Sequence, residues 1–234
     1  MTDPGLPVPD CGLRVLLLAD THVPVRARDL PAQVWEAVDT ADVVIHAGDW
    51  MSPALLDGLE AKAARLVGVW GNNDGPELRR RLPEVARVEL GGMAWGVVHE
   101  TGAKARREER MRAAHPDLDV LVFGHSHIPW DTEHAGLRLL NPGSPTDRRS
   151  QPHCTWMTCT VGGGAITELE LHALPRRPPR PQLQLPREEV ETDTAVVVVD
   201  VEVDEADALP RAEGEATALD RDARVGRDQA RHDV

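Results

Sequence analysis

The sequence has no tyrosine, few cysteines and no long hydrophobic run. Its three cysteines, Cys11, Cys154 and Cys159, are an odd number without a CxxC pair, which argues against a disulfide scaffold and for reduced thiols in a cytosol. No apolar stretch reaches the roughly 18–20 residues of a transmembrane helix, and the N-terminus lacks the basic and apolar regions of a signal peptide. We therefore expect a cytoplasmic protein without a membrane partner.

Positive charge is also scarce. The chain has 26 Lys and Arg against 39 Asp and Glu, which gives a formal net charge of −13 at pH 7. Surfaces that bind nucleic acids are basic, so we expect no nucleic-acid partner. Hydrophobic residues make up 41% of the 234 residues, which is enough to bury one sizeable core.

The composition changes near Leu174 and predicts two parts. Residues 1–174 carry the alternating apolar runs of a folded domain. Residues 175–186 are dense in Pro and Arg, which favours an extended linker because proline fixes φ and lacks an N–H. The acidic stretch 187–234 has few large apolar side chains and is predicted to be a disordered tail. Its strand-like run, 195–203, is either a segment that pairs with a sheet edge or a sticky patch within the tail.

Within residues 1–174, short apolar runs alternate with amphipathic segments. The expected strands are 13–19, 42–46, 66–70, 86–90, 93–98, 120–123, 137–140, 154–161 and 165–171. The expected helices are 31–38, 53–64 and 103–114, with Ser52 as an N-cap. Glycine pairs and triplets between later strands indicate hairpins. Parallel units followed by antiparallel strands predict an α/β fold of two packed sheets with outer helices.

Polar side chains follow five of the expected strands directly. The motifs are Asp20-Thr21-His22, Gly48-Asp49, Gly71-Asn72-Asn73-Asp74, His99 and Gly124-His125-Ser126-His127. In open α/β sheets chemistry gathers beyond the carboxyl ends of the strands. We therefore expect these side chains to share one site.

The residue types in these motifs indicate a metal site. Asp and Asn supply hard oxygens and His supplies nitrogen, a mixture that suits Mn²⁺, Fe or Zn²⁺ and suits Ca²⁺ poorly. The candidate ligands are Asp20, His22, Asp49, Asn72, His99, His125 and His127. Seven are too many for one tetrahedral ion and suit two ions bridged by a carboxylate, an arrangement that favours in-line phosphoryl chemistry. Taken singly, each residue could instead be a helix cap, a turn residue or a surface histidine.

The motif series, completed by Asn141-Pro142-Gly143-Ser144, resembles the calcineurin-like metallophosphoesterase superfamily over roughly residues 13–172. The chain is similar to its small prokaryotic branch of YfcE-type phosphodiesterases, which is related to the retromer subunit Vps29. This resemblance implies a four-layer α/β/β/α sandwich. It also implies a metal-dependent phosphoric ester hydrolase that acts on small phosphodiesters more than on monoesters.

The resemblance also implies roles for the candidate ligands. It assigns one ion to Asp20, His22 and His127 and the other to Asn72, His99 and His125. Asp49 bridges the two ions, and a hydroxide between them attacks phosphorus. Two divalent cations are thus the implied cofactors, with manganese expected first and Fe, Zn, Ni or Co as other candidates.

Two residues beside the ligands are predicted to take part in catalysis. Asn73 stands where many superfamily members have a histidine that assists the leaving group, and asparagine can donate a hydrogen bond to phosphate but is no general acid near pH 7. Asp74 is expected to orient a neighbouring group. A second departure is Glu100, where relatives usually have glycine. Either it points away from the site or it adds negative charge near an anionic substrate.

A different function is compatible with the same resemblance. The retromer relative implies a binding scaffold, with the tail recruiting a partner. Scaffold relatives tend to lose ligand histidines, whereas this chain keeps all of them, so the sequence favours the hydrolase. A DNA nuclease of the same superfamily is disfavoured by the negative net charge.

Overall fold

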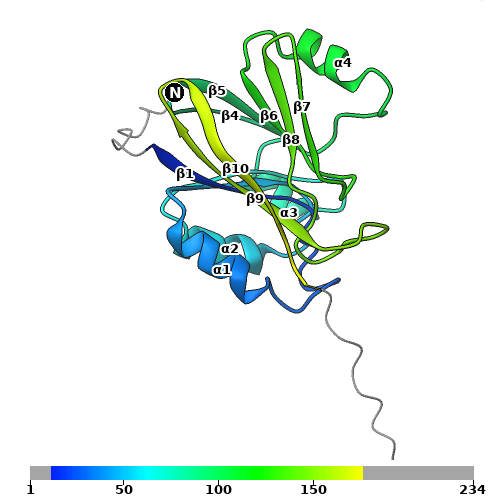
Figure 1. Ribbon diagram of the computed structural model, residues 1–234. Coiled ribbons are helices and arrows are strands. Elements are labelled where there is room, and N and C mark those ends of the chain that lie inside the picture. The colour runs from blue at the N-terminus through cyan, green and yellow to red at the C-terminus, as the bar shows by residue number, and fades with distance from the viewer. Residues whose placement is uncertain (1–11, 176–234) are drawn as a thin grey trace, which may run out of the picture. The chain divides into compact units, whose positions relative to one another are not determined.

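Two five-stranded sheets pack face to face in the computed structural model, which describes residues 12–175 (Figure 1). Helices cover the outer face of each sheet, so the predicted four-layer α/β/β/α sandwich is confirmed. The acidic tail and its strand-like run, 195–203, lie outside the described residues, and the boundary near Leu174 stays a prediction. Among the described residues, no helix is long and apolar enough to cross a membrane.

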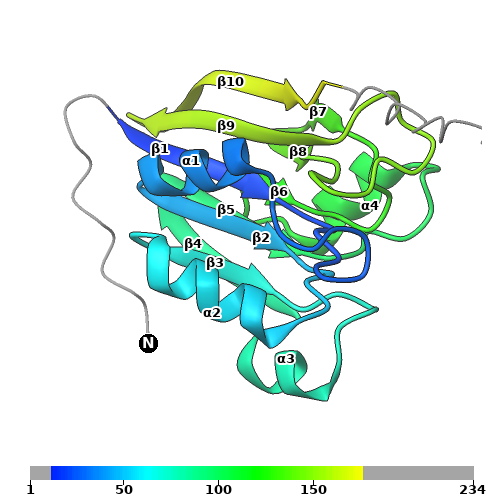
Figure 2. The ribbon, with the colours of Figure 1, turned by 90° about the horizontal axis from the view of Figure 1, so that it is seen from below.

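The first sheet has the order β10-β9-β1-β2-β3. Its strands are β1 (Leu13–Leu18), β2 (Val43–Ala47), β3 (Leu66–Val69), β9 (Thr155–Gly162) and β10 (Ala165–Ala173). β1, β2 and β3 run parallel, whereas β9 is antiparallel to both β1 and β10. The outer helices are α1 (Ala32–Thr40), α2 (Pro53–Lys62) and the short α3 (Pro76–Arg81), all on the same side in Figure 2. The side chain of Ser52 caps α2 as predicted, by accepting the Ala54 N–H at 3.1 Å.

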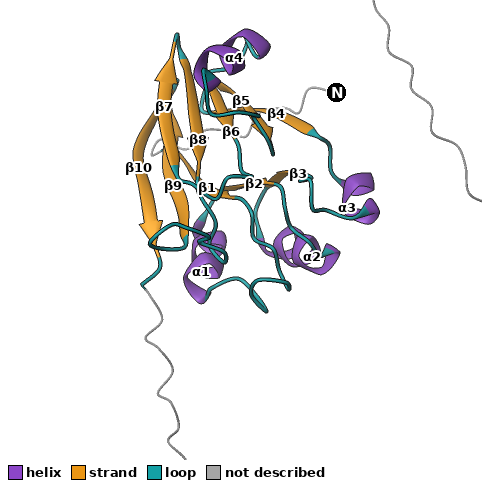
Figure 3. Cartoon of the chain, turned by 90° about the vertical axis from the view of Figure 1, so that its right-hand side faces the viewer, coloured by secondary structure: helices purple, strands orange, loops and turns teal. Residues whose placement is uncertain are grey.

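The second sheet has the order β4-β5-β6-β8-β7. Its strands are β4 (Val85–Leu90), β5 (Met93–Val98), β6 (Val120–Val122), β7 (Trp130–His134) and β8 (Leu137–Asn141). β5, β6 and β8 run parallel, and the edge strands β4 and β7 are antiparallel to their neighbours. α4 (Arg107–Ala114) packs on β7 and β8, on the opposite side of the sandwich from α1 and α2 (Figure 3).

The sequence analysis missed two elements and misplaced one boundary. α3 has six residues with three consecutive arginines, too short and too charged to show a helical apolar period. β7 pairs only with β8 and exposes most of its side chains, so it lacks the apolar run of an interior strand. α4 begins at Arg107, four residues later than predicted, and the segment before it forms a loop.

Three apolar layers hold the sandwich together. On β1, Val15 and Leu17 point between the sheets, whereas Leu16 and Leu18 pack against α1 and α2. Because both faces of this strand are buried after Arg14, its sequence is apolar from Val15 to its end at Leu18. A third layer, around Leu121, joins the second sheet to α4. Each side chain buried in these layers contributes roughly 1.5–3 kcal/mol, which fixes the frame on which the strand ends are held.

Candidate metal centre

The seven predicted ligands all lie in segments that follow the parallel strands of the two sheets. β1, β2 and β3 lead to Asp20-x-His22, Asp49 and Asn72, while β5 and β6 lead to His99 and His125-x-His127. Five of the seven have left-handed backbone, with φ between 44° and 68°: Asp20, His22, Asp49, His125 and His127. This conformation is costly for residues other than glycine and concentrates at functional sites. The chain therefore holds these five side chains in place against their backbone preference.

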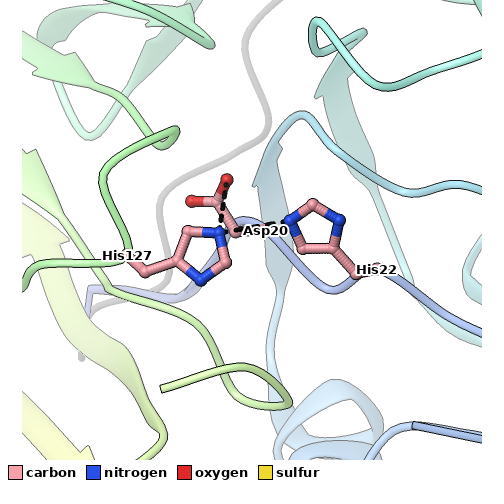
Figure 4. A group of neighbouring side chains, drawn as sticks. All are labelled: Asp20, His22 and His127. Atoms are coloured by element: carbon pink, nitrogen blue, oxygen red, sulfur yellow. Dashed lines mark hydrogen bonds and ion pairs between the residues drawn. The ribbon is translucent and has the colours of Figure 1, made fainter. Parts of the chain in front are cut away.

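Asp20, His22 and His127 form one buried group (Figure 4). The Nε2 atoms of the two histidines face each other at 3.1 Å, and His127 Nε2 lies 3.5 Å from Asp20 Oδ1. Burial lowers the pKa of His22 and lowers the pKa of His127 to about 4, so both rings are neutral at pH 7. Since His127 Nδ1 donates to the Asp147 carbonyl at 2.6 Å, its Nε2 carries the lone pair. That lone pair points into the group.

Asn72, His99 and His125 form the second group. Asn72 Oδ1 lies 2.9 Å from His99 Nε2 and 3.0 Å from His125 Nδ1. Burial lowers the pKa of His99, and its Nδ1 donates to the Ala47 carbonyl at 2.8 Å, so Nε2 again carries a lone pair. A nitrogen lone pair and an amide oxygen thus face each other without a proton between them. The group is more open than the first, because Asn72 is exposed and the His125 side chain is 42% exposed.

Asp49 lies between the two groups. Its Oδ2 is 3.5 Å from His22 Nε2 and its Oδ1 is 3.4 Å from His99 Nε2. Asp20 also lies close to both groups. Its carboxylate, the Asp49 carboxylate and the His99 ring form a second cluster, in which the donor atoms are within 4.8 Å of one another. Both carboxylates are buried, so ionisation of both would place like charges close together away from water.

The donor atoms fit bound cations. Asp20 Oδ2 is buried without a hydrogen-bond partner. Burial raises the pKa of the Asp20 carboxyl, and repulsion from Asp49 raises it further. Neutral imidazole nitrogens and carboxylate oxygens are the ligand forms that first-row divalent metals require. A cation among these atoms would satisfy the unpaired oxygen and separate the facing lone pairs.

The structure places Asn73 and Asp74 behind Asp49. The Asn73 backbone N donates to Asp49 Oδ1 at 2.9 Å and its side-chain Nδ2 donates to Asp49 Oδ2 at 2.7 Å. Asp74 accepts backbone N–H groups from Asp49, Met51 and Gly71 at 2.7–3.1 Å. Asn73 thus orients the central carboxylate directly, and Asp74 holds the Asp49 backbone. The predicted hydrogen bond from Asn73 to phosphate stays a prediction.

Ser144 of the Asn141-Pro142-Gly143-Ser144 motif and the segment after it support the site through long-range hydrogen bonds. The Ser144 hydroxyl donates to the Asp20 carbonyl at 2.7 Å, Thr146 Oγ1 donates to the Thr21 carbonyl, and Asp147 accepts from His127. The partners themselves are 20 or more residues away, up to 125 for Thr146, and no local pattern encodes them.

Comparison with known families agrees with this geometry. The family model described as the Calcineurin-like phosphoesterase superfamily domain matches residues 13–164. The chain therefore belongs to the calcineurin-like phosphoesterase superfamily, with buried Asp and His side chains as candidates for its metal site.

Individual relatives are consistent with this assignment. The chain is 34% identical over 131 residues to the "Probable metallophosphoesterase MJ0623" of Methanocaldococcus jannaschii, a match that covers 56% of this chain and 67% of the relative. The solution structure of Thermotoga maritima protein TM1076 is 32% identical, with a TM-score of 0.57 over 69% of this chain and 99% of that one.

The expected link to the retromer subunit is confirmed at the level of the fold. A crystal structure of Vps29 from Entamoeba histolytica, titled as complexed with Zn²⁺, has a TM-score of 0.56 at 22% identity, over 69% of this chain and 99% of that one.

Proposed function

We propose that the chain is a phosphoesterase that depends on two divalent cations and hydrolyses small phosphodiesters. The observation that carries the proposal is the convergence of imidazole nitrogens and of carboxylate and amide oxygens from both sheets, with one oxygen of Asp20 buried without a hydrogen-bond partner. Asp20, His22 and His127 would hold one cation, and Asn72, His99 and His125 the other, with Asp49 in contact with both. The bound pair would lower the pKa of a water molecule and neutralise charge on the phosphoryl oxygens.

The chain's own groups prepare this site. Asn73 and Asp74 fix the central carboxylate, so Asp49 needs no reorganisation when a substrate arrives. The amide of Asn73 supplies no acidic proton, so the leaving oxygen must depart without a general acid from this position. We therefore expect aryl esters, whose leaving groups are weak bases, to react much faster than alkyl esters.

A diester is the proposed substrate class because Glu100 places one carboxylate beside the second group. Glu100 follows β5 and places its Oε1 3.9 Å from Nε2 of His125. A monoester carries about −1.5 to −2 charges at pH 7, whereas a diester carries one. Repulsion from Glu100 therefore disfavours the monoester more, which agrees with the resemblance to small phosphodiesterases.

Glu100→Gln is expected to lower KM for an aryl phosphomonoester by about two- to fivefold, because exposed charge pairs are worth about 0.2–1 kcal/mol. KM for the matching diester should change less. Steady-state kinetics on both substrates measure the ratio of the monoester KM to the diester KM in each protein. Glu109→Gln on α4, whose carboxylate pairs with Arg106, is the control. An equal change for both substrates would remove the charge argument for a diester.

Manganese is proposed as the working metal because a mixed nitrogen and oxygen donor set without thiolate suits it. Zinc is the other leading candidate, since the Vps29 relative is described with that ion. A panel of divalent metals with the purified metal-free protein compares their ability to support hydrolysis.

The test of the function is hydrolysis of an aryl phosphodiester by the full chain. We expect turnover with Mn²⁺, its loss on chelation and its return when metal alone is added back. A folded protein that is inactive with every divalent metal would refute the hydrolase and leave the binding scaffold, whose fold the Vps29 structure shares.

A further inference from the structure

Arg79 holds the turn that carries Asn72 and Asn73 from outside the site. Its Nη2 donates to the Asn72 carbonyl at 3.0 Å and its Nε donates to the Asp74 carbonyl at 2.8 Å. The guanidinium also lies over the Trp70 ring, with Cζ 4.4 Å from the ring centroid. One planar group therefore fixes the residue before the turn and two residues within it.

The helix that carries Arg79, α3, is anchored to the core. α3 begins immediately after the turn, and its Leu78 is 1% exposed. The Trp70 backbone N donates to the Pro83 carbonyl at 3.1 Å, which ties the end of β3 to the segment after α3. Motion of the turn is thus coupled through the Arg79 side chain to α3, whose Leu78 is buried in the core.

The two cation groups differ in how they are held. The first group is buried and is tied by the Ser144 hydroxyl and the Asp147 carbonyl. In the second group Asn72 is exposed, so packing restrains it less and water competes for its backbone carbonyl. Hydrogen bonds of Gly71 and Asn73 hold the turn on either side of Asn72, and Arg79 holds the Asn72 carbonyl itself.

We propose that Arg79 is a positioning residue that sets the affinity of the second cation, the one held by Asn72, His99 and His125. The inference rests on the proposed function, since it requires a chain that binds two cations. Loss of the two carbonyl contacts frees the turn and weakens this cation, whereas the first group keeps all of its contacts. Groups that orient metal ligands typically contribute 10- to 100-fold in affinity.

Arg79→Gln tests the proposal in the full chain by Mn²⁺ titration with isothermal calorimetry. We expect one ion to bind as in the wild type and the other about 10- to 100-fold more weakly. In parallel assays, the Mn²⁺ concentration that gives half-maximal hydrolysis should rise, while kcat at saturating Mn²⁺ returns towards the wild-type value. A merely structural defect would lower the melting temperature without this separation of the two ions.

Arg81→Gln is the matched control because it lies on the same helix and has a different task. Arg81 pairs with Asp57 and Glu60 of α2, each at 2.7 Å. Its loss should lower stability slightly and leave both Mn²⁺ affinities unchanged. Arg79→Lys keeps the charge but cannot span both carbonyls, so its affinity for the second Mn²⁺ should lie between those of the wild type and Arg79→Gln. This variant also serves as the test if Arg79→Gln does not fold.

The outcomes separate the inference from the function beneath it. If the wild type binds two ions and hydrolyses diesters but the folded Arg79 variants bind both ions equally well, the inference is wrong and the function stands. If Arg79→Gln and Arg81→Gln each lower the affinity for both Mn²⁺ ions to the same extent, Arg79 supports only the fold, and the inference is also wrong. If the wild type binds fewer than two ions, the proposed function fails and the inference fails with it.

Discussion

Asp49→Asn is expected to lower kcat/KM for an aryl phosphodiester by at least about 1,000-fold. Asp49 is the carboxylate that faces both groups, with His22 on one oxygen and His99 on the other. Charge stabilisation by a bound metal is worth several kcal/mol, and each 1.4 kcal/mol is about a factor of ten in rate. The neutral amide keeps the shape of the side chain, so the loss reports charge and cation binding.

The same substitution should leave the metal-free protein as stable as the wild type or more so. Repulsion from Asp49 contributes to the raised pKa of Asp20, and both carboxylates are buried. Removing one charge relieves that repulsion. Added Mn²⁺ should then raise the melting temperature of the wild type and raise that of the variant far less. A ligand that binds the folded state more weakly stabilises it less at the same concentration.

Asp39→Asn is the matched control for Asp49→Asn. Asp39 lies on α1 and pairs with Lys62 at 2.8 Å, with more than half of its side chain exposed. Its loss should change stability by less than about 1 kcal/mol and leave the kinetics unaltered. Activity of Asp49→Asn within tenfold of the wild type would contradict the role assigned to this carboxylate.

Local pattern predicted that these side chains lie close together, because strand ends are a local property. The strand beginning at Leu13 is apolar on both faces, and its parallel neighbours are too, so their ends could be recognised without a structure. Because the carboxyl ends of parallel strands meet at the same edge of a sheet, the polar residues that follow the strands are expected to lie together at that edge. Six of the seven predicted ligands lie in the two adjoining groups, and Asp49 lies between the groups.

The supporting contacts could not be predicted, because they depend on how distant segments meet. The hydrogen bonds from Asn73 to Asp49 join residues that are 24 positions apart, and no local pattern encodes them. The contact from Arg79 to Asn72 requires α3, whose six polar-rich residues show no helical pattern. Left-handed backbone at Asp20 and His22 is likewise imposed by tertiary contacts, since these residue types do not demand it.

Gly71→Ala is expected to damage both stability and activity, because the glycine lies directly against Asp49. A Cβ at this position would lie 2.2 Å from Asp49 Oδ1 and 2.3 Å from its backbone N. The Gly71 N–H also donates to Asp74 Oδ2 at 2.7 Å, which limits how far the turn can retreat. Overpacking of this kind typically costs about 1–3 kcal/mol and occasionally more, and we expect a loss of about 3 kcal/mol. A displacement of about 1 Å at the central carboxylate should lower kcat/KM about 100-fold.

Gly75→Ala, four residues along the same turn, separates this steric effect from a general intolerance of alanine. A Cβ at Gly75 would meet nothing within 4 Å, and its φ of −73° suits any residue. Because alanine is a poorer N-cap than glycine, we expect a change of about 1 kcal/mol at most and near-normal kinetics. Urea unfolding of the metal-free proteins and diester kinetics measure both effects. Equal behaviour of the two variants would show that the turn yields freely at Gly71, and Asp49 would then not be held by contact with this glycine.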